Sequence, residues 1–207
     1  MTALRQAVAL RAVPPGPGID LPRAERAVAE LLSALGQDRA SAHMADTPRR
    51  VAAGYAELLR PPEFDLTTFP NEEGYDELVL ATGIPVTSLC QHHLLPFVGI
   101  AHVGYLPGER IVGLSKLARV VELFARRLQV QERLTVEVAE WLQERLAPRG
   151  VGVVLEAEHL CMTLRGVRAN GARTVTSALH GLLREDPSSR QEFLTLTGRT
   201  GRTGRTG

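Results

Sequence analysis

The sequence predicts an α+β fold, in which a pair of helices is followed by two strands, two helices and two further strands. Four segments repeat apolar residues with the period of an α-helix, and runs rich in β-branched residues, each the length of a strand, lie between them. Stretches rich in Gly and Pro separate the segments. With 207 residues, 44% of them hydrophobic, the chain can bury the core of one domain.

The chain begins with a leader, residues 1–19, that we expect to be flexible because it ends in a run of Pro and Gly. A first helix is expected over about residues 21–35, where apolar residues form one stripe. Asp20 is the expected N-cap, and Gly36 is the expected stop signal. This helix opens an N-terminal helical segment of residues 20–62.

The second helix of that segment is expected to begin with Thr47 as its N-cap. Pro48 follows at the first helical position, where a missing N–H costs nothing. Two consecutive prolines, Pro61 and Pro62, end the helix. A turn-rich stretch then leads into the next domain.

We expect residues 63–196 to form the second and larger domain. Two helices with a clear 3.6-residue period are predicted at about residues 115–127 and 132–146. Strands are predicted on both sides of this helical pair, at about residues 76–82, 84–90, 97–106, 150–157 and 173–177. The last segment, residues 197–207, repeats Thr-Gly-Arg and is expected to be a disordered tail whose arginines are solvated.

The charge balance argues against two classes of partner. The chain has 24 basic and 23 acidic residues, so no net field attracts nucleic acid or an anionic membrane. No run of eighteen apolar residues and no signal peptide is recognisable. We therefore expect a cytoplasmic protein, in which a structural disulfide would be unusual.

The two cysteines of the chain each lie beside histidines. They occur in Cys90-Gln91-His92-His93 and in His159-Leu160-Cys161. Two thiolates and one imidazole are what a catalytic zinc ion needs, because such a site has three protein ligands and leaves the fourth position to water. A buried pair of thiols, or a disulfide between Cys90 and Cys161, is the alternative.

Four longer motifs resemble the GTP cyclohydrolase I family, zinc enzymes that open the purine ring of GTP. The resemblance extends from about Leu21 to Leu196, with the motifs in the family's order. The motifs are Ser88–Phe97, Gly113–Arg119, Gln129–Thr135 and Glu158–Met162.

The resemblance implies the tunnelling fold, in which an antiparallel four-stranded sheet carries two helices in the order ββααββ. It also implies a barrel-like homo-oligomer, a decamer with active sites between subunits. The implied reaction converts GTP and water into formate and 7,8-dihydroneopterin triphosphate, the first step of folate, pterin or deazapurine biosynthesis.

The same resemblance assigns residues. Cys90, His93 and Cys161 match the ligands of Zn²⁺, which activates the water that attacks C8 of guanine. His92 and His159 match the histidines that move protons, although either could be a packing residue.

Further positions match the family in its sugar rearrangement and substrate binding. Ser115 matches the position assigned to the sugar rearrangement, and its alternative role is to cap a helix. Glu132 matches the carboxylate that reads the guanine edge, with Gln131 beside it, and its alternative is a favourable charge at a helix start. The triphosphate would be bound by Lys116, Arg119, Arg165 and Arg50, which singly read as solvated charges.

One departure from the family bears on the site. Gln91 stands where the family usually has glutamate, which changes a charge beside the proposed zinc ligands. Other readings are a paralogue of a deazapurine pathway, a nitrile reductase of the same fold, and a zinc-stabilised scaffold protein whose site has decayed. The nitrile reductase does not need the paired cysteine and histidine motifs.

Overall fold

The computed structural model describes residues 8–11, 18–37, 41–63 and 65–198. Most of the expected leader and the expected tail from residue 199 onward lie outside this part of the chain. Strand β1 (Val8–Arg11) falls within the segment expected to be a leader, and it pairs antiparallel with β2 (Asp65–Pro70). In the described ranges no helix combines the length and the apolar character needed to cross a membrane.

The two N-terminal helices form where the sequence predicts them. Helix α1 (Leu21–Ala34) is capped by the Asp20 carboxylate, which accepts a hydrogen bond from the Arg23 N–H at 3.0 Å. Helix α2 (Thr47–Leu58) begins one residue earlier than its predicted cap implies. Asp46 holds the N-cap position, so the prediction of Thr47 as N-cap is wrong; the Asp46 carboxylate instead pairs with Arg49 at 2.6 Å.

The main sheet confirms the predicted order of strand, strand, helix, helix, strand, strand. Helices α3 (Leu114–Ala125) and α4 (Gln131–Leu146) connect its two antiparallel pairs. A two-residue strand, β6 (Leu128–Gln129), extends the sheet by pairing parallel with the end of β3. The order across the sheet is β6-β3-β4-β7-β8, with β3 (Val79–Cys90), β4 (Pro96–Leu106), β7 (Gly150–His159) and β8 (Thr174–Gly181).

The prediction of separate strands at 76–82 and 84–90 is wrong. One strand, β3, covers both segments, and its register with β4 shifts between Ala81 and Ile84. Gly83 lies at this irregularity with φ of +67°, a conformation that residues with a side chain rarely adopt. The glycine that reads as a turn in the sequence is therefore a bulge within one strand.

Two other groups of elements were not predicted. A second sheet joins β1, β2 and the three-residue strand β5 (Arg110–Val112) in the order β1-β2-β5. Three helices follow the later strands: α5 (Leu160–Thr163), α6 (Leu182–Glu185) and α7 (Pro187–Leu196).

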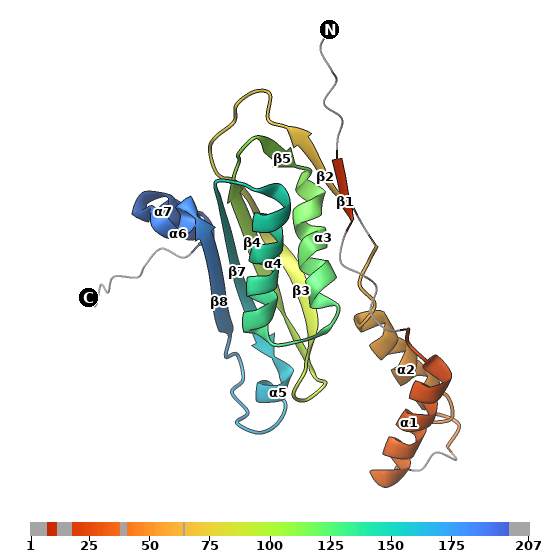
Figure 1. The fold of residues 1–207 in the computed structure, drawn as a ribbon. Coiled ribbons are helices and arrows are strands. Elements are labelled where there is room, and N and C mark those ends of the chain that lie inside the picture. Colours follow the sequence, from red (N-terminus) through yellow and green to blue (C-terminus); the bar gives the residue numbers. More distant parts are fainter. Residues whose placement is uncertain (1–7, 12–17, 38–40, 64, 199–207) are drawn as a thin grey trace, which may run out of the picture.

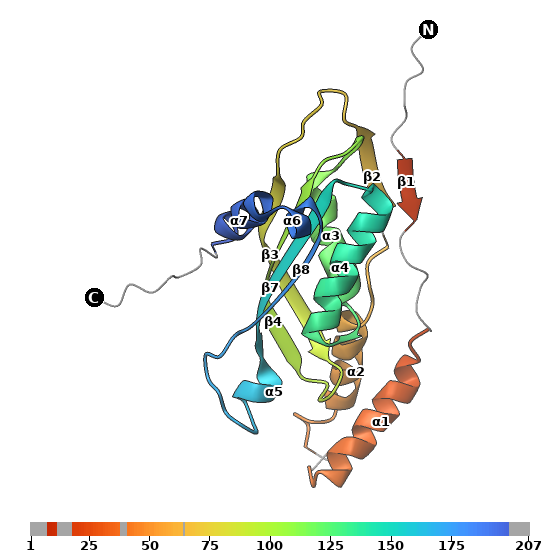
Figure 2. The same cartoon turned by 60° about the vertical axis from the view of Figure 1, so that its left-hand side comes forward.

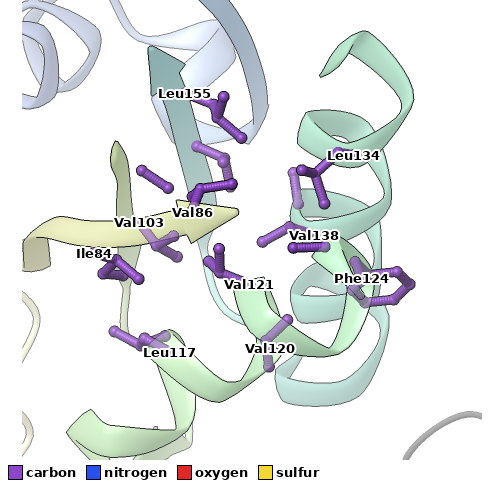
Figure 3. Close-up of a cluster of buried hydrophobic side chains, with 14 of the residues drawn as sticks. Ile84, Val86, Val103, Leu117, Val120, Val121, Phe124, Leu134, Val138 and Leu155 are labelled. Carbon is purple, nitrogen blue, oxygen red and sulfur yellow. The ribbon is translucent and has the colours of Figure 1, made fainter. Parts of the chain in front are cut away.

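Helices α3 and α4 cover one face of the main sheet, and the principal core lies between them and the strands (Figure 1). Alternate residues of β3, β4 and β7 point toward the helices, as the two-residue period of a strand requires. Figure 3 shows these side chains meeting the apolar stripes of both helices, among them Ile84, Val86, Val103, Leu117, Val121, Leu134, Val138 and Leu155.

The opposite face of the sheet carries a smaller core beneath α6 and α7 (Figure 2). Phe193 of α7 is fully buried there with Leu106, Val154 and Leu183. A Cβ added at Gly152 would lie 2.8 Å from the Phe193 ring, so the absence of a side chain at this position is what admits the ring. The two cores fix both faces of β4 and β7, the strands that lead to the predicted site.

Candidate metal centre and its surroundings

Cys90, His93 and Cys161 bring three ligand atoms together. These atoms all lie within 4.8 Å of one another. The Cys90 Sγ atom is 3.7 Å from His93 Nδ1 and 4.0 Å from Cys161 Sγ. A tetrahedral zinc ion with ordinary bond lengths would hold two sulfurs about 3.8 Å apart and a sulfur and a nitrogen about 3.5 Å apart. The spacing and the donor set therefore fit zinc.

A tight turn after β3 places the histidine over the first cysteine. The N–H groups of His93 and Leu94 both donate to the Cys90 carbonyl, at 3.3 and 2.9 Å, and the Cys90 N–H donates to Leu95 at 2.9 Å. Leu94 has φ of +55°, which lets the chain reverse within these residues. Cys90 is 5% exposed, whereas His93 is exposed, so the cluster is open on the histidine side.

The second cysteine arrives through the sheet. Strand β4 lies between β3 and β7, and His159 at the end of β7 pairs with Phe97 at the start of β4. Helix α5 begins immediately afterwards and holds Cys161, which is buried. Two segments seventy-one residues apart in the sequence thus meet at one end of the sheet, where Figure 1 shows α5 beside the turn between β3 and β4.

The disulfide alternative is wrong, because both cysteines are free. Their separation of 4.0 Å is about twice the length of a disulfide bond. Burial raises the pKa of the Cys161 thiol, and the neighbouring Cys90 raises it further. A buried thiol whose ionisation is disfavoured beside a second thiol is the kind of donor that a divalent cation stabilises as a thiolate.

His92 lies on the same turn but is not part of the cluster of three. Its Nδ1 atom is 3.8 Å from Cys90 Sγ, and its ring is exposed. The His92 and His93 rings meet edge to face, with centroids 6.2 Å apart. Of the two, only His93 places a nitrogen within reach of both sulfurs.

His159 is half-buried and held from two sides. Its ring stacks on Phe97, with centroids 4.8 Å apart and planes inclined by 13°. Its Nε2 atom lies 2.8 Å from Gln131 Oε1. Burial lowers the pKa of His159, and the negative charge of Glu132 opposes this in part.

Gln131 and Glu132 begin α4 and point to different surroundings. Gln131 is 1% exposed, and its amide group bonds to the sheet and to His159. Glu132 is exposed in the first turn, where the helix dipole favours a negative charge. In this chain Glu132 is free to face a ligand, whereas the side chain of Gln131 is already fully bonded.

Of the four predicted basic residues, Arg165 is near the cluster, whereas Arg50, Lys116 and Arg119 lie on other helices. Arg165 is close enough for its charge to favour the Cys161 thiolate, and Arg50 on α2 is exposed and lies 3.6 Å from Asp46. Ser115 and Lys116 lie in the first turn of α3, and Arg119 one turn later. The other end of α3, about 15 Å from Ser115 at 1.5 Å per residue, is the end that leads to β6 and Cys90.

The alternative role of Ser115 as a helix cap is wrong, since Gly113 holds the N-cap position of α3.

The structure also contains contacts that hold the site in place and that were not predicted from the sequence. Tyr55 of α2 donates from its hydroxyl to the Leu94 carbonyl at 3.0 Å, which ties the N-terminal helices to the ligand turn. Thr135, one helical turn after Gln131, donates from its hydroxyl to the Gln131 backbone carbonyl. The i, i+4 spacing of these two polar residues could have indicated this contact from the sequence.

Comparisons with known proteins find relatives of one family along most of the chain. The family model described as GTP cyclohydrolase I matches residues 24–198. A protein of Thermobifida fusca named GTP cyclohydrolase 1 is 55% identical over 86% of this chain and 89% of its own. Another of that name, from Mycobacteroides abscessus, is 53% identical over 90% of this chain and 94% of its own. Among solved structures, an archaeosine synthase QueF-Like in the apo form aligns with 50% of this chain at 18% identity and a TM-score of 0.42, too weak a likeness to bear on fold or function.

Proposed function

Because the chain belongs to the GTP cyclohydrolase I family and is a hydrolase of that type, we propose that it converts GTP and water into formate and 7,8-dihydroneopterin triphosphate. The observation that supports this most directly is the cluster of Cys90, His93 and Cys161 with His159 beside it. Three ligand atoms at zinc spacing, open on one side, are typical of a catalytic metal site rather than a structural one.

Zinc is the metal that we propose for this cluster. Two thiolates balance the charge of the ion, and the exposed side at His93 leaves room for a fourth ligand. When bound there, zinc would supply a water molecule acidic enough to lose its proton near neutral pH. Two reduced thiols are required for this site, which is consistent with the cytoplasmic location that we propose.

The remaining residues of this end of the sheet would handle protons and the base. His159, kept neutral by burial, can accept and return a proton as the purine ring opens, and the exposed His92 can do the same at the mouth of the cluster. The Glu132 carboxylate can accept hydrogen bonds from N1–H and the 2-amino group of guanine. Adenine lacks this pair of donors, so the contact would select guanine.

We also propose that each active site uses two subunits of a homo-oligomer, a decamer by family resemblance. Ser115, Lys116 and Arg119 are too far along α3 to serve the metal cluster of their own chain. Apolar side chains near the cluster also lack cover within one chain, because Leu164 is 67% and Val167 is 74% exposed. A neighbouring subunit could cover these side chains and bring its own α3 to the triphosphate.

The proposal is tested by incubating the zinc-loaded protein with GTP. We expect release of formate in equal amount to a pterin, which is measured by its fluorescence after oxidation. ATP under the same conditions should give neither product. Absence of formate with GTP, in protein that contains zinc, would refute the proposed reaction.

A further inference from the structure

The hydrogen-bond partners of the Gln131 side chain determine which of its two terminal atoms is the amide nitrogen and which is the oxygen. Its Nε2 atom lies 3.1 Å from the Leu155 carbonyl of β7 and 3.0 Å from the Thr174 carbonyl of β8. Backbone carbonyls only accept hydrogen bonds, so the NH₂ end of the amide must face them. The carbonyl end, Oε1, therefore faces His159.

This orientation fixes the proton on the imidazole. Oε1 of Gln131 lies 2.8 Å from Nε2 of His159 and can only accept. His159 must therefore carry a proton on Nε2 whether its ring is neutral or charged. In the neutral ring, Nδ1 is then the nitrogen with a free lone pair.

Two hydroxyl groups, of the buried Thr135 and the partly buried Thr176, support the same direction of bonding. Thr135 Oγ1 donates its proton to the backbone carbonyl of Gln131 at 2.8 Å, so across the 2.6 Å contact it must accept from Thr176. Thr176 Oγ1 thereby keeps a lone pair for the Gln131 NH₂ group at 3.2 Å. This series of donors and acceptors is satisfied only when the NH₂ end of the Gln131 amide faces Thr176.

The ring of His159 is also prevented from turning over. Phe97 stacks on it at 4.8 Å between centroids, which fixes the plane of the ring. A rotation of 180° about the Cβ–Cγ bond would keep this plane but would place a carbon atom where Nε2 lies. Gln131 Oε1 would then lose its N–H donor. Gln131 is 1% exposed, so water does not have ready access to Oε1 and cannot easily take the place of the lost N–H donor.

We propose that Gln131 is a positioning residue, whose amide holds His159 as the Nε2–H tautomer and leaves Nδ1 to exchange protons with the substrate. The exchange with substrate rests on the proposed GTP cyclohydrolase reaction, whereas the tautomer does not. In this role Gln131 acts through His159 and does not bind guanine through its side chain, which differs from the contact that the sequence suggests.

The first measurement needs no variant. Magic-angle-spinning NMR of zinc-loaded protein with ¹⁵N-labelled histidine reports which ring nitrogen carries the proton. The His159 signals are assigned by their loss in His159→Gln. We expect the neutral His159 ring to carry its proton on Nε2, and a proton on Nδ1 alone would overturn the proposal.

The second measurement compares the same substitution at two positions of α4. Gln131→Met keeps the length of the side chain and removes its polar atoms, and the control Gln143→Met makes the same exchange near the other end of the helix, where the amide donates to the Pro148 carbonyl at 3.3 Å. We expect Gln131→Met to give a mixture of tautomers and to lower kcat about 10- to 100-fold, as loss of an orienting partner does. Its KM for GTP, and both constants of Gln143→Met, should stay within about threefold of the native values.

Other outcomes have distinct meanings. Equal losses of kcat in both variants would show that Gln131 only supports the fold, and a change in KM alone would show that it contacts the substrate; each would overturn the proposal. If the native protein releases no formate, the proposed function fails, while the NMR measurement still decides the tautomer.

Discussion

Two groups of predicted site residues lie toward opposite ends of helix α3, and only one group is assembled within the chain. At the end near β6, the strands β3, β4 and β7 bring Cys90 and Cys161 to 4.0 Å from each other. At the other end, Ser115 and Lys116 lie in the first helical turn, away from that cluster. The sheet can position residues on neighbouring strand ends, but a helix separates residues along its axis.

We propose from this comparison that one chain holds two half-sites. The half with the metal cluster is rigid, because its residues are tied to buried strands on both sides of β4. The half with Ser115 and Lys116 lies on one helical turn, and we propose that a neighbouring subunit completes it. Mutations in the two halves should therefore behave differently, and the predictions below use that difference.

The largest effect is expected from Cys161→Ala in the rigid half. The native protein should hold about one zinc per chain, and the variant should lose both zinc and formate release, because the described residues include no other thiol besides Cys90. Metal analysis and a formate assay measure the two losses. The exposed neighbour Met162→Ala is the control and should keep both. Full zinc occupancy in Cys161→Ala would remove Cys161 from the ligand set.

A second prediction tests whether the halves belong to different chains. Cys161→Ala and Lys116→Ala should each be nearly inactive alone. When the two are co-expressed, random mixing gives intact combinations at about one quarter of the sites if the halves come from neighbouring subunits. Activity of the purified mixture, with each variant alone as reference, measures this recovery. No recovery in verified mixed oligomers would mean that each chain works by itself.

Parts of this arrangement were predictable from the sequence, and other parts were not. The helices α3 and α4 have long periodic patterns, and strand β7 is a nearly unbroken run of β-branched residues. The cysteines are conspicuous because each lies beside histidine. Strand β5 has three residues, too few to show a periodic pattern. Gly83 within β3 is a residue typical of turns, and for this reason one strand was predicted as two. The role of Gln131 depends on carbonyls of β7 and β8 that are distant in the sequence, so no local pattern could indicate it.

A third prediction concerns Glu132, which lies beside the rigid half but is exposed in one chain. If it accepts hydrogen bonds from guanine, Glu132→Gln should cost about 2 to 4 kcal/mol in transition-state stabilisation, because a charged acceptor is replaced by an amide. The ratio kcat/KM for GTP measures this cost. Glu144→Gln, an exposed change near the other end of α4, is the control and should be nearly neutral. Native-like efficiency in Glu132→Gln would mean that another group reads the base.

The smallest effect is expected at Gln91, which lies on the ligand turn with an exposed side chain. Its N–H donates to the Gln129 carbonyl at 2.9 Å, so the backbone is fixed while the side chain faces solvent. Gln91→Glu adds a negative charge near the cluster, which favours the protonated forms of neighbouring groups. The pH–rate profile should therefore move to higher pH, with unchanged zinc content.

The size of this shift should depend on salt, because the added charge is exposed. We expect a shift of a few tenths of a pH unit at low ionic strength and less at about 1 M salt, where the screening length falls to about 3 Å. Profiles of formate release at two ionic strengths measure it, with Gln91→Asn as the uncharged control. Identical profiles at low salt would show that position 91 does not sense the site. An inactive native protein that gains activity as Gln91→Glu would instead identify Gln91 as the residue that disabled it.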